Sequence, residues 1–155
     1  LFQAQDSTGA VLASISATGD LTVETATING TLTVNGNATI NGHVISGNTS
    51  GSTTAATGAA ADCSASGLAN ISGNDTAGTI TITTSTGACA AGTLATITFA
   101  NAYGNAPEVV ITPKDANGAS LQYYNGSATT AAFTIDTGVG ATASTVYTYS
   151  YHVIE

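Results

Sequence analysis

The sequence predicts an all-β protein with an N-terminal β-prism or triple β-helix stalk and a C-terminal antiparallel β-sandwich head. Three features along the 155 residues predict this fold class. They are a six-residue repeat, a stretch rich in Gly, Ser and Thr, and a series of short apolar segments with turn residues between them. We therefore expect a trimeric β stalk over 1–46, a linker over 47–62 and a sandwich head over 63–155.

The six-residue repeat runs over 25–42 as TATING, TLTVNG and NATING, and HVISG follows as a weaker fourth block. In each full block the second and fourth residues are apolar, which is the alternation of a half-buried strand. Asn-Gly closes each block and tolerates the positive φ that a sharp corner requires. The predicted stalk core consists of these apolar pairs, Ala26, Ile28, Leu32, Val34, Ala38 and Ile40.

A chain of two-residue hairpins does not fit the repeat. In a hairpin the residues that flank Asn-Gly share a face, so Ile28 would pair with Thr31 and Leu32 would point to the opposite face. A period of six keeps the apolar pairs in phase if every corner turns the same way, as in a β-helix or β-prism. The repeat supplies about one coil of a single-chain β-helix, which is too little to bury a core. Three chains around a common axis would each contribute one wall.

Short strands are predicted on both sides of the repeat. Upstream, residues 1–23 predict strands around a Ser-Thr-Gly turn and an Ala-Thr-Gly-Asp turn. The head is predicted to contain six strands, over 79–85, 92–100, 107–114, 119–125, 131–138 and 144–155.

Tyrosines recur in two of the predicted head strands. Alternation places three of them on one face of the last strand, where a half-buried sheet or a subunit interface is favoured over a ligand platform. The candidate surface or interface residues of the head are Tyr123, Tyr124, Tyr147, Tyr149 and Tyr151.

The hexads resemble the triple β-helical shafts of bacteriophage tail fibres and related trimeric adhesins. The stretch from FANAYGNAPEVVIT through AAFTIDT to YTYSYHVIE is similar to the strand order of H-type lectin heads and phage receptor-binding heads. The resemblance implies a six-stranded head that forms trimers and binds sugar. The expected partners are therefore other copies of the chain and a cell-surface glycan.

Cys63 and Cys89 are the only cysteines, and they lie beside a Gly/Ala-rich loop without a neighbouring histidine. This pattern predicts a disulfide, and therefore an extracellular location on a cell or virion surface. Two buried free thiols in a cytosolic protein are the alternative. The chain begins at Leu1 without a methionine, and we expect it to be a fragment of a longer polypeptide.

The charge pattern argues against several functions. One lysine stands against nine acidic residues, for a net charge of −8, which argues against nucleic acid and anionic lipid as partners. No apolar run is long enough to span a membrane. His43 and His152 are far apart and Cys-x-x-Cys is absent, so no metal or other cofactor is expected. His152, Asp136 and a serine could be drawn as a triad, but serine is too abundant for this to be specific, and no catalysis is expected.

Three functions compete. The first is an extracellular homotrimeric fibre segment whose head binds a receptor, and the second is a filament subunit that donates a strand to the next subunit. The Asn-Gly interruptions favour the trimer, because a donated strand needs one continuous alternation. The third is binding to ice or another crystal surface through a flat threonine ladder, for which Thr27, Thr33, Thr39 and the segment TITITT are candidates.

Overall fold

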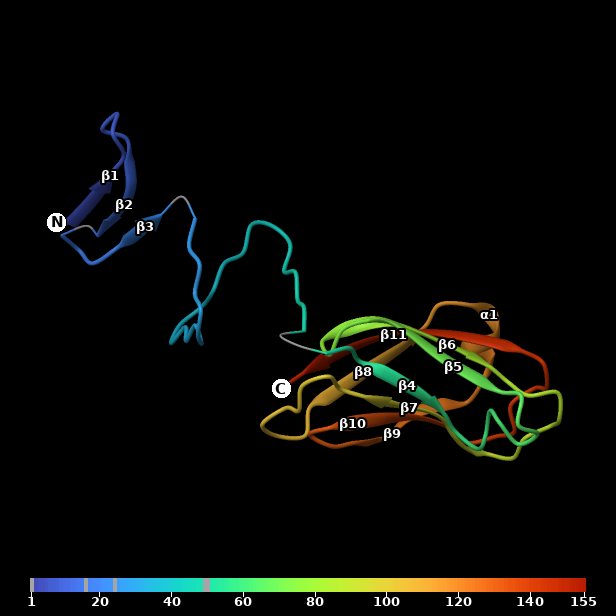
Figure 1. The fold of residues 1–155 in the computed structure, drawn as a ribbon. Helices are drawn as coiled ribbons and strands as arrows, with labels where there is room; N and C mark the ends of the chain where they lie inside the picture. The colour runs from blue at the N-terminus through green and yellow to red at the C-terminus, as the bar shows by residue number, and fades with distance from the viewer. Residues whose placement is uncertain (1, 16, 24, 49–50) are drawn as a thin grey trace. The chain divides into compact units, whose positions relative to one another are not determined.

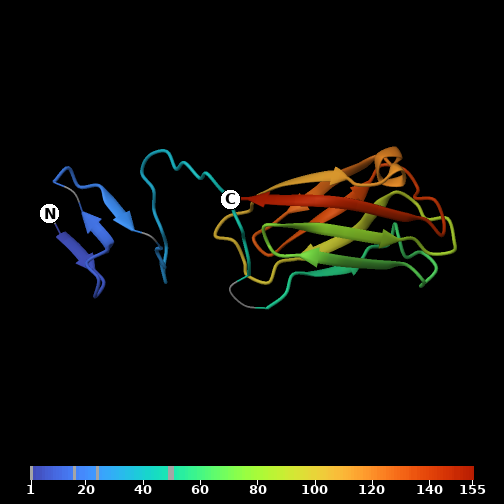
Figure 2. The same ribbon diagram turned by 90° about the horizontal axis from the view of Figure 1, so that it is seen from above.

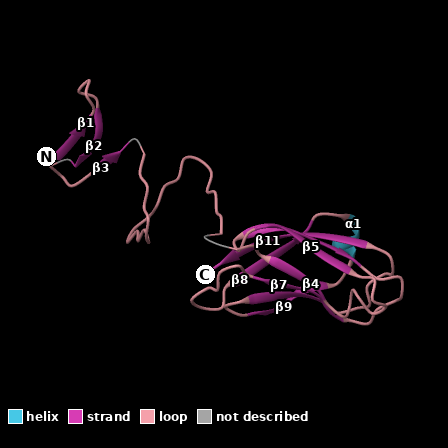
Figure 3. Ribbon diagram, in the orientation of Figure 1, coloured by secondary structure: helices cyan, strands magenta, loops and turns pink. Residues whose placement is uncertain are grey.

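The structure is a computed structural model that describes residues 2–15, 17–23, 25–48 and 51–155. Five residues of the predicted stalk and linker lie outside the described ranges, namely Leu1, Ser16, Glu24, Thr49 and Ser50. The chain divides into two compact units, Leu1–His43 (unit 1) and Val44–Glu155 (unit 2). The strands of both units pair antiparallel, and the helix in the described residues is one short segment (Figures 1 and 3). The predicted all-β class is confirmed.

Unit 1 begins with a three-stranded antiparallel sheet in the order β1-β2-β3, with β1 at Phe2–Gln5, β2 at Val11–Ile15 and β3 at Leu21–Val23. In the first turn, Asp6 Oδ1 accepts hydrogen bonds from the Thr8 and Ala10 backbone N–H groups at 2.8 and 3.0 Å. Gly9 and Gly19 adopt positive φ in the two turns. The predicted strands and turns of this region are therefore confirmed.

The hexad segment forms no strand within the described stretch 25–48, so the strands predicted there are not formed in the single chain. All six predicted core residues lie exposed, and the four large ones are at least half exposed, namely Ile28, Leu32, Val34 and Ile40. A lone extended segment has no backbone or apolar partner to hold it as a strand. Packing of the hexads in a trimer stays a prediction.

Unit 2 contains two four-stranded antiparallel sheets (Figures 1 and 2). We name them by their central strands. The β7/β10 sheet has the order β4-β7-β10-β9, with strands Thr54–Thr57, Gly92–Thr98, Ala132–Thr137 and Tyr123–Ala128. The β6/β11 sheet has the order β5-β6-β11-β8, with strands Leu68–Gly73, Ala77–Thr83, Val146–Ile154 and Glu108–Pro113. Helix α1 spans Ala116–Ser120.

One buried cluster takes side chains from the inner faces of both sheets of unit 2. Burial alternates residue by residue along β10 and β11, as expected for strands with one covered face. Rings from the two sheets meet in this core, where the Phe133 and Tyr151 centroids are 5.5 Å apart. The fully buried large side chains include Ile80, Ile82, Leu94, Ile97, Phe133, Ile135 and Tyr149.

Three parts of unit 2 differ from the expected element pattern. The predicted linker contains β4, whose small residues pair along β7 from Thr54↔Thr98 to Thr57↔Ala95. Backbone pairing, not apolar bulk, defines this edge strand, so the sequence pattern did not show it. Strand β5 was also missed, and the predicted strand 119–125 is wrong in its first half, which contains the end of α1 before β9 begins.

The described residues hold no helix that is long and apolar enough to cross a membrane.

Candidate functional site

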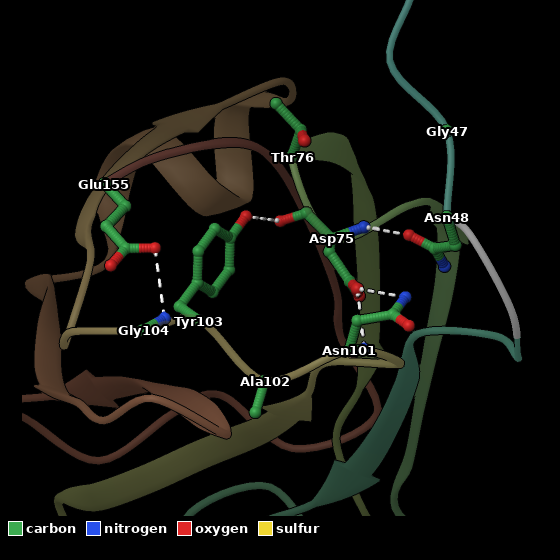
Figure 4. A pocket seen from close by; sticks show the side chains of 9 residues that line it. All are labelled: Gly47, Asn48, Asp75, Thr76, Asn101, Ala102, Tyr103, Gly104 and Glu155. Atoms are coloured by element: carbon green, nitrogen blue, oxygen red, sulfur yellow. Dashed lines mark hydrogen bonds between the residues drawn. The ribbon is translucent and has the colours of Figure 1, made fainter. Parts of the chain in front are cut away.

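The candidate site is an open cavity of about 250 Å³ at one end of unit 2 (Figure 4). Four parts of unit 2 line it: the segment 47–48 before β4, the turn between β5 and β6, the loop after β7, and the last residue, Glu155. The lining residues are Gly47, Asn48, Asp75, Thr76, Asn101, Ala102, Tyr103, Gly104 and Glu155.

Asp75 lies at the centre of the hydrogen bonds around this cavity. Its Oδ1 accepts from the Thr53 hydroxyl and the Ala100 backbone N–H, both at 2.7 Å. Its Oδ2 accepts from the Asn101 backbone N–H at 2.8 Å and from the Asn101 side-chain amide at 3.2 Å. The carboxylate is buried, and each oxygen has two donors, so it fastens three chain segments together.

These hydrogen bonds control the charge of Asp75. Burial by itself raises the pKa of the Asp75 carboxyl, because desolvation disfavours the charged form. The donors from Thr53, Ala100 and Asn101 favour the carboxylate and together outweigh burial, so the pKa lies below its usual value. The site therefore holds a fixed negative charge at neutral pH.

The first residues of unit 2, 46–48, form hydrogen bonds with the turn between β5 and β6. The Asn48 side-chain oxygen accepts from the Asp75 backbone N–H at 2.8 Å, and the Asn74 amide donates to the Ser46 carbonyl at 2.6 Å. Asn74 Oδ1 also accepts from the backbone N–H groups of Thr76 and Ala77, which closes the turn. Ser46 occupies the fourth position of the weak block HVISG, so its contact with the turn between β5 and β6 coincides with the loss of the apolar repeat.

Tyr103 and Glu155 form the other wall of the cavity. The Tyr103 hydroxyl donates to the Asp75 carbonyl at 3.0 Å, and its ring meets Phe99 edge-on at 4.8 Å. Burial raises the pKa of Tyr103. Glu155 accepts from the Asn105 backbone N–H at 2.6 Å and from the Gly104 N–H at 3.2 Å, and the bonds from Asn105 are the main reason that its pKa is lowered.

No family model, curated protein or solved structure matches this chain. The function must therefore be inferred from the geometry of the chain itself.

The polar groups that line the cavity hold segments of the chain together. Both of its carboxylates already accept hydrogen bonds from the protein, and Tyr103 donates to the backbone. No three His, Cys, Asp or Glu side chains of the described ranges are grouped so that they could hold a metal ion. Two carboxylates without a cationic side chain make the lining negative, so any ligand of the cavity would have to be neutral or cationic.

The predicted disulfide between Cys63 and Cys89 is present, with Cα atoms 5.4 Å apart. It joins the loop before β5 to the loop before β7. Strand β6 starts beside the Asp75 turn and ends at Thr83, next to the second of these loops. The disulfide and the cavity therefore lie at opposite ends of β6.

Three of the five candidate tyrosines lie in the core between the two sheets, so they fit the half-buried sheet that alternation favoured and are not surface residues. Tyr147, Tyr149 and Tyr151 are at most 2% exposed, because the β7/β10 sheet covers the face of β11 on which they lie. Burial raises the pKa of Tyr151 to about 12. Tyr123 is half-buried, with its ring 4.8 Å from that of Tyr149, and Tyr124 is exposed.

The residues of the conceivable triad do not come together. His152 is exposed on β11, and Asp136 lies on β10 in the other sheet. Alternation directs both side chains away from the shared core, so they lie on outer faces of different sheets. His43 is exposed at the end of unit 1.

The sequence analysis missed Asp75, Asn101 and Glu155. The only local signal was Asn74-Asp75-Thr76, a turn-forming tripeptide between two alternating segments. The pairing of Asp75 with a residue 26 positions away has no local sequence signature.

Proposed function

We propose that this chain is a segment of an extracellular homotrimeric fibre, with a structural stalk and an adhesive head. In this proposal the hexads form a β-prism or triple β-helix with two other copies, and unit 2 is a β-sandwich head. The observation that carries the proposal is the exposure of the in-phase apolar pairs of the repeat. Leu32 is 69% exposed and Ile40 is 60% exposed in the single chain.

The free energy of burial explains why these side chains favour trimers. Burying one Val, Leu or Ile side chain stabilises by about 1.5–3 kcal/mol. Each chain carries four such side chains in register at the second or fourth position of a hexad. A single chain of about one coil cannot bury them, whereas three copies can place them on a common axis.

The proposed adhesive role concerns unit 2. Its disulfide supports an oxidising, extracellular environment. The sequence pattern of this region is similar to that of H-type lectin heads and phage receptor-binding heads, and we propose a cell-surface glycan as the receptor. The net charge of −8 favours a neutral glycan over an anionic one.

Assembly by strand donation is the second candidate, and the free edges of the sheets favour it. Strands β4, β9, β5 and β8 are edges in the described sheets, and an edge strand can accept a donated strand. The strands of unit 1 already pair with one another. Ala13 of β2 lies opposite Ala4 of β1 on one side and Val23 of β3 on the other, so these strands would have to separate before donation. This cost makes the trimer the better proposal.

Sedimentation equilibrium tests the proposal with the 155-residue chain. We expect a mass three times that of the 15.1 kDa chain. The double variant Leu32→Asn/Val34→Asn should be monomeric, because it places amides on the apolar face. The matched control Thr31→Asn/Thr33→Asn changes the opposite face of the same block and should stay trimeric. A monomeric wild-type chain would overturn the trimer, and open-ended polymers would favour strand donation.

A further inference from the structure

The outer face of the β6/β11 sheet carries most of the exposed large apolar side chains on the strands of unit 2. Four of them lie on three strands of this sheet, Leu68, Val110, Val146 and Ile154, and each is at least 42% exposed. Among the described residues, Tyr124 is the only exposed large apolar side chain on the strands of the other sheet. The two outer faces of unit 2 are therefore unequal.

Small uncharged side chains fill the centre of this face. Thr79, Thr81 and Thr83 alternate with the buried Ile80 and Ile82, so they point outward from β6. Their neighbours in register on β11 are Ser150, Thr148 and Val146. Asn70 and Ser72 continue two of these rows onto β5. The result is a ladder of short side chains with apolar groups at both of its ends.

The distribution of charged residues in unit 2 indicates what kind of partner this face can bind. The four strands of the β6/β11 sheet contain one acidic residue, Glu108, and the strands of the β7/β10 sheet also contain one, Asp136, so the position of the lysine makes the difference between the two faces. The only lysine reaches this face, since Lys114 Nζ donates to the Thr79 hydroxyl at 3.0 Å. Copies with a net charge of −8 repel one another, so they can approach best through the face with the least negative charge.

The charges at the edge of the sheet also match a second copy. Glu108 begins β8 and Lys114 follows its end at Pro113, so this edge carries one charge of each sign. Charge-poor centres with apolar and small polar side chains are typical of subunit interfaces, and charged groups are typical of their rims. Both features fit another copy of the chain better than a charged receptor.

We infer that the outer face of the β6/β11 sheet is the surface through which the heads pack on one another, with a second copy of this chain as its occupant. The inference rests on the proposed trimer and adds the part of the head that takes part in it. It leaves the loops at the disulfide end of unit 2 outside the interface.

Charge substitution on the two sheet faces tests the inference. Val110→Glu/Val146→Glu adds two charges to the proposed interface, and Thr98→Glu/Tyr124→Glu adds two charges at exposed positions of the other sheet. We expect the first variant to raise the concentration at which the trimer dissociates by about tenfold or more, because like charges would meet across the interface. The second should change it by less than about threefold. Circular dichroism establishes that both variants are folded.

The single lysine permits a second test that needs no substitution. A carbodiimide joins an amine to a carboxylate with which it is in direct contact. Lys114 is the one side-chain amine of the chain, so every side-chain link that the reagent forms must include it. A mixture of ¹⁵N-labelled and unlabelled chains distinguishes links between copies from links within one copy. We expect a Lys114–Glu108 link between copies in the covalent oligomers. Covalent oligomers that link Lys114 only to acids outside this sheet would overturn the inference.

The outcomes separate the two proposals. If the wild-type chain is trimeric and Leu32→Asn/Val34→Asn dissociates it, but Val110→Glu/Val146→Glu does not weaken it, the face inference fails and the fibre proposal stands. If the wild-type chain is monomeric at all concentrations, the trimer itself fails. Equal weakening by both charge variants would also overturn the face inference, since net charge alone would then explain the effect.

Discussion

Unit 1 and unit 2 contain the same kind of apolar alternation, but they differ in what covers it. Leu94 of β7 is 0% exposed, whereas Leu32 of the hexads is 69% exposed. In unit 2 a second sheet covers the inner face of the first, whereas the described residues of unit 1 leave the apolar side chains of the repeat exposed. The comparison teaches that alternation selects which face of a segment is apolar, while burial depends on a second layer.

The two units differ in the same way in their carboxylates. Asp6 accepts hydrogen bonds from residues two to four positions away in one turn, and the Thr8 hydroxyl is the main reason that its pKa is lowered. Asp75 accepts from Thr53, Ala100 and Asn101, which are between 22 and 26 positions away. Local contacts therefore organise the strands of unit 1, and distant contacts organise unit 2.

The largest expected effect comes from the same substitution made in each unit. Leu94→Ala should lower the free energy of unfolding of unit 2 by about 2–5 kcal/mol, because it removes a fully buried side chain. Leu32→Ala should leave that free energy unchanged and should weaken the trimer instead. Urea denaturation followed by tyrosine fluorescence measures the first quantity, and sedimentation equilibrium measures the second. A large loss of unit 2 stability from Leu32→Ala would break the comparison.

Removing the disulfide should affect unit 2 alone. Cys63 and Cys89 are 26 positions apart, and opening a loop of this length costs about 3–4 kcal/mol in the chain-entropy model. We expect Cys63→Ala/Cys89→Ala to lower the melting temperature of unit 2 while the mass of the assembly stays the same below that temperature. Loss of the trimer in the folded double variant would contradict the assignment of the stalk as the main site of assembly.

Asp75→Asn should have an intermediate effect that depends on pH. The amide that replaces one oxygen faces N–H donors, so the loss at pH 7 should be about 1–3 kcal/mol. The folded-state pKa of Asp75 lies below its unfolded value of 3.8, so the stability that it adds is complete above that pH and is lost as the pH falls through the folded pKa.

The variant should therefore lose less stability than the wild type between pH 7 and pH 3, as measured by urea denaturation at both values. Thr98→Ser, at an exposed position on β7 that carries no titratable group, is the control and should keep the acid sensitivity of the wild type. Equal acid sensitivity in Asp75→Asn and the wild type would mean that the hydrogen bonds to the Asp75 carboxylate do not stabilise unit 2.

The smallest expected effect is at Glu155. Its carboxylate is exposed and holds the backbone N–H groups of Gly104 and Asn105. Glu155→Gln should speed hydrogen exchange at these two amides without moving the unfolding midpoint of unit 2. The same increase should occur in the wild type as the pH falls through the lowered pKa of Glu155, after correction for intrinsic exchange. A shift of the global midpoint would show that this wall of the cavity supports the whole fold.

Periodicity predicted most of the strands correctly. Observed strands overlap each of the predicted segments 79–85, 92–100, 107–114, 131–138 and 144–155, because each has one face in the shared core. Strand β4 was not predictable in this way, since TAAT carries no large apolar residue and is defined by its pairing with β7. In the hexads the pattern predicted strands where the described stretch 25–48 has none, because alternation alone supplies no neighbouring strand to pair with.

The candidate site was less predictable than the fold. The disulfide pair followed from the sequence because the chain has only two cysteines. The buried position of Tyr149 did not follow from the sequence. Alternation assigned this side chain to one face of its strand but did not predict which face another sheet would cover. The cavity around Asp75 joins four segments that are far apart in sequence, and nothing local links them.

The sequence by itself determined the all-β class, the turns of unit 1, the in-phase apolar pairs of the hexads and the disulfide. These features depend on the types and spacing of residues that are close in sequence or, for the cysteines, on having a single possible partner. Only the tertiary structure decided which faces are covered, that Asp75 collects donors from distant segments, and that the outer face of the β6/β11 sheet is left exposed and poor in charge. Burial and long-range hydrogen bonds depend on which layers meet, and that is a property of the folded chain.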